Sequence, residues 1–154
     1  MKKASVLGFV ACFMILVISG CGSKDTRDFN IENHGWVFST LSKVSSENGE
    51  IVACGETVSE QYSDVPIIAM TCSAADGILS VGTADGERLD FSYQMTGKDT
   101  NSLIYELVYR KGDEEVKGMA VSSMTEYAKG KYEYTLVVDI DGYAVYFYDR
   151  EDET

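Results

Sequence analysis

Cys21 is the residue of this chain whose type and position point most directly to chemistry. Lys2 and Lys3 give the chain a positive start, and residues 6–18 are thirteen uncharged, mostly apolar residues. Two small residues then stand directly before the cysteine. A positive start, an apolar middle and small residues at a cut point make up a secretory signal peptide. The apolar run is too short to span a membrane, which takes about 20 residues.

The segment Ile18-Ser19-Gly20-Cys21 resembles the bacterial lipobox. The resemblance implies that the Cys21 thiol receives a diacylglycerol and that a lipoprotein signal peptidase cuts just before it. Two acyl chains hold a protein stably on a membrane, at about 0.8 kcal/mol per buried CH₂, whereas one chain is marginal. We therefore expect a signal peptide over residues 1–20, a lipidated start and tether over 21–31, and a location on the extracytoplasmic side of the cell membrane.

The charge of the mature chain excludes one class of partner. Removal of residues 1–20 takes Lys2 and Lys3 with it, so 11 basic and 25 acidic side chains remain, a net charge of −14. Such a surface repels nucleic acid and anionic lipid head groups. We expect no nucleic-acid binding, and we expect the diacylglycerol alone to hold the protein on the membrane.

Two cysteines remain for structural roles once Cys12 leaves with the signal and Cys21 carries lipid. Cys54 and Cys72 lie in apolar, strand-like runs, and an oxidising compartment lets a disulfide persist. A bridge would stabilise the fold by about 3 kcal/mol through its constraint on the unfolded chain. We expect this bridge; two buried free thiols are the alternative. A metal pair is not expected, because the chain has one histidine, His34, and no CxxC motif.

The other polar residues form no catalytic or cofactor pattern. The chain has a single histidine, no GxSxG motif and no phosphate-cradling glycine loop. Asp139-Ile140-Asp141-Gly142 matches only a fragment of a calcium loop, and an aromatic strand follows it. We expect a hairpin turn there, and neither enzymatic activity nor a cofactor nor a metal.

Hydrophobic alternation with a period of two predicts an all-β domain over residues 32–150. Leu103, Tyr105, Leu107 and Tyr109, for example, fall on one side of their segment. Asn-Gly and Asp-Gly dipeptides between such runs accept the positive φ angles of tight hairpin turns. The predicted strands cover residues 36–44, 50–55, 67–72, 78–83, 87–95, 102–110, 115–124, 132–140 and 143–149. Residues 123–131 could carry a helical turn, no other helix is expected, and residues 151–154 are expected to form an acidic tail.

Successive hairpins with short links favour a meander of eight or nine strands that closes into an up-and-down barrel, because closure removes the exposed edges. An open β-sandwich is the alternative. Trp36 at the start of the first strand, followed by such strands, resembles the lipocalin-like barrels of small bacterial lipoproteins. That family opens with glycine, one residue and tryptophan, whereas this chain has His34-Gly35-Trp36. The resemblance implies that Arg150 packs on Trp36 and closes the barrel floor.

Two functions are compatible with such a barrel. If the barrel is hollow, it can hold one small apolar ligand. The candidate ligand contacts are Trp36, Phe91, Tyr93, Tyr105 and Tyr134. If the interior is filled, an envelope protein–protein interaction or assembly module without a ligand cavity is the alternative.

The last strand predicts where such a module would bind. Tyr143, Val145 and Phe147 share one face, and Ala144, Tyr146 and Tyr148 share the other. Because both faces are apolar, this strand is expected to be covered on both sides or to offer one side to a partner.

Overall fold

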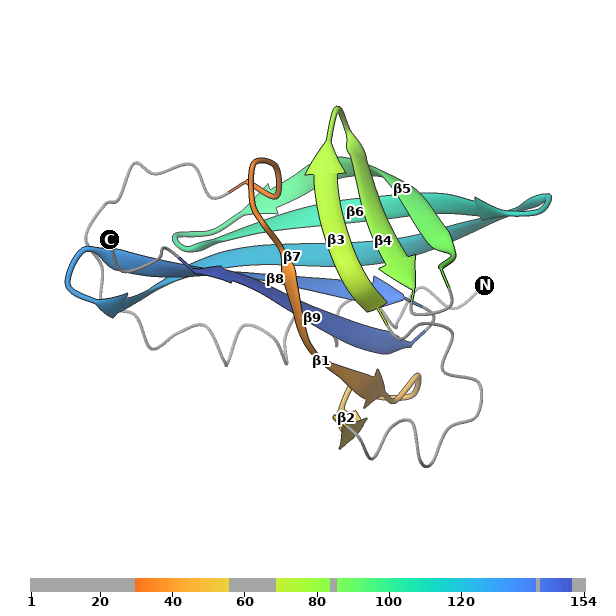
Figure 1. Ribbon diagram of the computed structural model, residues 1–154. Coiled ribbons are helices and arrows are strands. Elements are labelled where there is room, and N and C mark those ends of the chain that lie inside the picture. The colour runs from red at the N-terminus through yellow and green to blue at the C-terminus, as the bar shows by residue number, and fades with distance from the viewer. Residues whose placement is uncertain (1–29, 56–68, 84–85, 141, 151–154) are drawn as a thin grey trace.

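The computed structural model describes residues 30–55, 69–83, 86–140 and 142–150. Within these ranges every regular element is a strand (Figure 1), which confirms the all-β prediction. The strands are β1 (Val37–Val44), β2 (Ile51–Cys54), β3 (Ala69–Ala75), β4 (Ile78–Thr83), β5 (Arg88–Lys98), β6 (Ser102–Lys111), β7 (Glu114–Ala128), β8 (Lys131–Ile140) and β9 (Tyr143–Arg150). The signal peptide, Cys21, the connection 56–66 and the acidic tail lie outside the described residues.

Eight of these strands form a closed antiparallel barrel. The ring runs β1-β3-β4-β5-β6-β7-β8-β9, and β9 pairs back with β1 (Figure 1). Strand β2 is an extra strand, because it pairs with the end of β1 from Ser42 to Val44, while Val37 at the start of β1 pairs with Thr71 of β3. The meander and its closure are therefore confirmed, and the open sandwich is wrong.

The alternating pattern determines which side chains fill the interior. Inward residues from β3 to β9 join Ile31 and Trp36 in one continuous core. The members of this core from the two longest inward rows are Leu103, Tyr105, Leu107 and Tyr109 on β6, and Tyr132, Tyr134, Leu136, Val138 and Ile140 on β8. Burial of such side chains stabilises the fold by about 1.5–3 kcal/mol each relative to exposure.

Strand β7 is longer than the alternation predicts, and the helical turn that residues 123–131 could have carried does not form. The β7–β8 ladder continues through Glu126↔Tyr132 to Ala128↔Lys131. Gly130, with φ 75°, then allows the chain to reverse within a tight turn. Continued pairing satisfies backbone groups that a helical turn would have to satisfy within itself.

The predicted disulfide is also wrong, because Cys54 and Cys72 are both free. Cys54 pairs with Ser42 near the end of β1, whereas Cys72 follows Thr71, which pairs with Val37 near its start. Five residues of strand separate those positions by about 17 Å, and a disulfide requires Cα atoms within about 7 Å. Cys54 is exposed and Cys72 faces the core, so the two thiols also differ in environment.

Candidate functional site

The five predicted ligand contacts all lie in the barrel interior, where they pack on neighbouring side chains. Trp36, Phe91, Tyr105 and Tyr134 are buried. The half-buried Tyr93 ring meets the Tyr105 ring edge-on, with the ring centroids 5.6 Å apart. A centroid distance of this size is typical of packed aromatic pairs. The structure therefore brings the predicted residues together as members of the core.

The chain segment before β1 closes one end of this core. The Trp36 indole N–H donates to the Ile31 carbonyl at 2.9 Å, and Ile31 is itself buried. The His34 ring lies beside both Trp36 and Tyr134, with centroids 4.8 and 4.4 Å apart. His34 Nδ1 is 2.9 Å from the Asp149 carboxylate at the end of β9. This segment is thus fastened to the last strand of the barrel.

A second polar contact holds the same segment. The Tyr93 hydroxyl donates to the Glu32 carboxylate. Burial, followed by this hydrogen bond and the Glu32 charge, raises the pKa of Tyr93 well above its usual value. The phenol therefore stays protonated, so it remains available as the donor to Glu32.

Arg150 does not close the barrel floor on Trp36. Its guanidinium bonds the Glu133 carboxylate, with Nε at 2.8 Å, and lies 4.9 Å from the centroid of the Tyr127 ring. Glu133 and Arg150 are partners in the β8–β9 ladder. They face outward, because Tyr134, which follows Glu133 on β8, faces the core. His34, rather than Arg150, packs beside Trp36.

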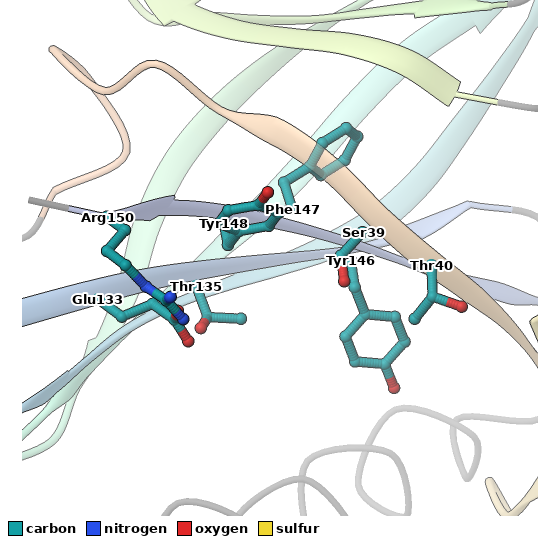
Figure 2. A pocket seen from close by; sticks show the side chains of 8 residues that line it. All are labelled: Ser39, Thr40, Glu133, Thr135, Tyr146, Phe147, Tyr148 and Arg150. Carbon is teal, nitrogen blue, oxygen red and sulfur yellow. The ribbon is translucent and has the colours of Figure 1, made fainter. Parts of the chain in front are cut away.

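A pocket of about 370 Å³ opens on the outer wall of the barrel. Its lining residues are Ser39 and Thr40 on β1, Glu133 and Thr135 on β8, and Tyr146, Phe147, Tyr148 and Arg150 on β9 (Figure 2). Figure 2 shows the Phe147 ring directed away from the Tyr146 ring. Since the Phe147 side chain is fully buried in the core, its main chain is what borders the pocket.

Strand register assembles this outer pocket, which we call the β1/β8/β9 pocket. Tyr148 pairs with Thr135 on one side and with Val37 on the other. The β1–β9 register shifts between Phe38 and Thr40, so Ser39 is an extra residue on β1. A bulge of this kind bends the strand and redirects a side chain.

The pocket holds one acidic and one basic side chain, and these neutralise each other. Glu133 and Arg150 form an ion pair at one side of the pocket (Figure 2). The other side chains at its surface are hydroxyl-bearing: two threonines, a serine and two tyrosines. The pocket therefore offers donors and acceptors without a net charge.

A buried apolar cluster adjoins the pocket on the outward side of the barrel wall. Val44, Met119, Val137 and Ala144 form it, and Tyr146 packs against them. Val137 faces outward because its neighbours Leu136 and Val138 both lie in the interior core. This confirms the prediction that both faces of the last strand are apolar, and Tyr146 belongs both to the cluster and to the pocket.

The sequence identified only part of the outer pocket. The aromatic pattern of the last strand predicts Tyr146 and Tyr148 as surface contacts. Ser39, Thr40 and Thr135 carried no signal of their own, because exposed hydroxyl residues are ordinary on the wet face of a strand. Their convergence depends on the registers of β9 with both β1 and β8.

Among the described residues, no three His, Cys, Asp or Glu side chains gather in a way that could hold a metal ion. In the same part of the chain there is no helix long and apolar enough to cross a membrane.

The fold and the site define a closed eight-stranded antiparallel barrel with a packed interior and a small polar pocket on its outer wall. The chain matches no family model, no curated protein and no solved structure. The functional argument therefore depends on the residues of this chain.

Proposed function

We propose that this protein is a lipid-anchored binding protein on the extracytoplasmic side of the cell membrane. In this proposal it recognises another component of the envelope with the outer face of β1, β8 and β9. The observation that carries the proposal is the β1/β8/β9 pocket, which opens outward beside the exposed apolar side chain of Val37. Proteins commonly bind partners at surfaces that combine aromatic side chains with a polar surround.

The anchor in this proposal is a diacylglycerol on Cys21. Only eight residues separate Cys21 from Asn30, so the barrel would stay close to the membrane. The mature net charge of −14 opposes direct contact with anionic head groups, which leaves the lipid as the means of attachment.

Binding of a small apolar ligand inside a lipocalin-like barrel is the second candidate function. The aromatic side chains that would contact the ligand are Trp36, Phe91, Tyr93, Tyr105 and Tyr134. They instead contact one another and neighbouring core residues. An interior ligand would have to displace these contacts, whereas the outer pocket is already formed. Binding at the outer face is therefore the better supported function.

Site-specific photo-crosslinking in cells tests the proposed binding face. A benzophenone amino acid replaces Tyr148 in the full-length, lipidated chain, and a matched chain carries it at Ile78. The two positions are equally accessible, at 37% and 39% exposed, but Ile78 lies on β4, three strands away around the ring. We expect a discrete adduct from position 148 and none from position 78. Equal adducts from both positions, or no adduct from either, would contradict the proposal.

A fluorescent fatty acid tests the second candidate. The purified protein is titrated with the probe, and Leu107→Ala serves as the comparison, because Leu107 is fully buried in the interior core. A packed interior predicts no saturable binding to the wild-type chain. Saturable binding that Leu107→Ala alters would favour the interior site over the outer face.

A further inference from the structure

We infer that the β1/β8/β9 pocket binds a neutral saccharide. This inference rests on the proposed function, because it names the chemistry that the outer binding face would recognise. The pocket combines three features that together suit a sugar: hydroxyl groups, aromatic side chains and a balanced charge pair.

The hydroxyl groups match the most abundant group of a sugar. Ser39, Thr40 and Thr135 line the pocket together with Tyr148. A hydroxyl both donates and accepts hydrogen bonds, and so does each hydroxyl of a saccharide. A lining of this kind can pair with a polyol in several orientations without leaving a donor or acceptor unmatched.

The charge pair indicates that the ligand is neutral. Glu133 and Arg150 already satisfy each other's charge, so a cation gains little from Glu133 and an anion gains little from Arg150. The surrounding chain, at −14 after loss of the signal peptide, repels anions further. The Glu133 carboxylate can still accept hydrogen bonds, and the Arg150 guanidinium can still donate them, at the edge of the pocket.

The tyrosine rings supply flat apolar surface for the C–H faces of a sugar. A pyranose ring has faces made of C–H groups, and these pack on an aromatic ring. Tyr148 is 37% exposed, so its ring is accessible from solvent. Tyrosine combines a broad apolar ring with a polar hydroxyl group. A pyranose is similar, because its faces carry C–H groups and its edge carries hydroxyl groups.

Size and rigidity agree with a short saccharide or a segment of a longer one. A volume of about 370 Å³ lies near the lower end of small-molecule sites. The lining comes from three paired strands rather than from loops, with Thr135 opposite Tyr148 and Thr40 opposite Tyr146. A pre-ordered lining reduces the ordering cost of binding. Because the pocket opens on the outer wall, a polymer could continue past it.

A protein partner would use different residues of the same face. The centre of a protein interface is apolar and contains few charges, so a protein would engage the exposed apolar side chain of Val37, which pairs with Tyr148. A saccharide would engage the polar pocket. Substitutions in the two places therefore separate the two kinds of partner.

Binding of the purified, lipidated protein in detergent micelles to immobilised neutral hexose and N-acetylhexosamine oligosaccharides tests the inference. Thr135→Val removes one pocket hydroxyl with little change in volume, and Tyr148→Ala removes one ring. Thr96→Val is the matched control, because Thr96 is an exposed residue of β5, outside the pocket. We expect saturable binding of at least one oligosaccharide, weakened about tenfold by each pocket variant and unchanged in Thr96→Val, with unaltered melting temperatures.

Absence of binding across the panel would overturn the saccharide inference, and so would binding that both pocket variants retain in full. The crosslinking experiment separates this failure from failure of the proposed function. A protein adduct at position 148 without saccharide binding would overturn the saccharide and leave the binding face intact. Absence of both would overturn both proposals.

Discussion

His34 Nδ1 lies 2.9 Å from Asp149 Oδ2, which joins two residues 115 positions apart in the chain. The same carboxylate oxygen accepts the Gly35 backbone N–H at 3.3 Å. The His34 side chain is only 11% exposed. One carboxylate at the end of β9 thus holds the segment that leads from the tether into β1.

Replacement of Asp149 by alanine is expected to destabilise the barrel by about 1–2 kcal/mol, because the partly buried His34 ring and the exposed Gly35 N–H both lose their partner. Urea unfolding of the variant measures the change. Glu106→Ala is the control, since Glu106 forms an exposed pair with Lys117 at 3.4 Å and such pairs contribute about 0–1 kcal/mol. Equal losses in the two variants would contradict a special role for Asp149.

The two free thiols are expected to differ strongly in reactivity. Burial raises the pKa of the Cys72 thiol to about 12 and keeps reagents away from it, whereas Cys54 is exposed. In native protein at pH 8, maleimide should label a Cys72→Ser chain rapidly and a Cys54→Ser chain only after denaturation. Mass spectrometry counts the adducts. If neither thiol of the wild-type chain reacts even after denaturation without reductant, Cys54 and Cys72 are not free thiols.

The Cys72 thiol also predicts a loss of stability at alkaline pH. Its pKa rises from 9.0 in the reference state to about 12 in the fold, so the folded state favours the protonated thiol. The resulting stability is fully present below pH 9 and is lost as the pH rises from 9 to 12. The free energy of unfolding should fall more steeply over this range in the wild-type chain than in Cys72→Ala. Parallel curves would contradict the assignment.

Gly118 is expected to tolerate no side chain, because β7 and β8 approach closely there. A Cβ at this position would lie 2.6 Å from the Asp139 carbonyl oxygen, which is backbone and cannot move aside alone. Gly118→Ala should cost about 1–3 kcal/mol of unfolding free energy. A Cβ at Gly97 would meet only side-chain atoms of Ile104, the nearest of them Cδ1 at 3.3 Å. Thermal melts of Gly118→Ala and Gly97→Ala should therefore differ, and equal melts would count against the close approach.

Cys21→Ala is expected to abolish lipidation, because alanine has no thiol to receive the diacylglycerol. Cells grown with a labelled fatty acid should incorporate label into the wild-type chain and none into the variant. The variant should also leave the membrane fraction or accumulate as the uncut precursor. Cys54→Ala is the matched control and should be labelled like the wild type. A wild-type chain without label would contradict the proposed lipid anchor.

The strands and the faces of their side chains follow from local patterns in the sequence. Alternation is a local property with a period of two, so Leu107 and Leu136 could be assigned to an apolar face without knowledge of the fold. Asp76-Gly77 likewise marked a turn, and both residues do adopt positive φ. The length of β7 escaped this reasoning, because pairing with β8 extended it beyond the apolar pattern.

The pairing of distant strands depends on the closed barrel as a whole. The pairing of β9 with β1 closes the barrel and leaves β2 as an extra strand, and this arrangement separates Cys54 from Cys72. The same pairing brings Ser39 to Tyr146 and Tyr148, while the β8–β9 register turns Arg150 outward to Glu133. Register between strands far apart in the chain depends on the packing of the whole core and on bulges. No local pattern encodes it, which is why the pocket emerged only from the closed barrel.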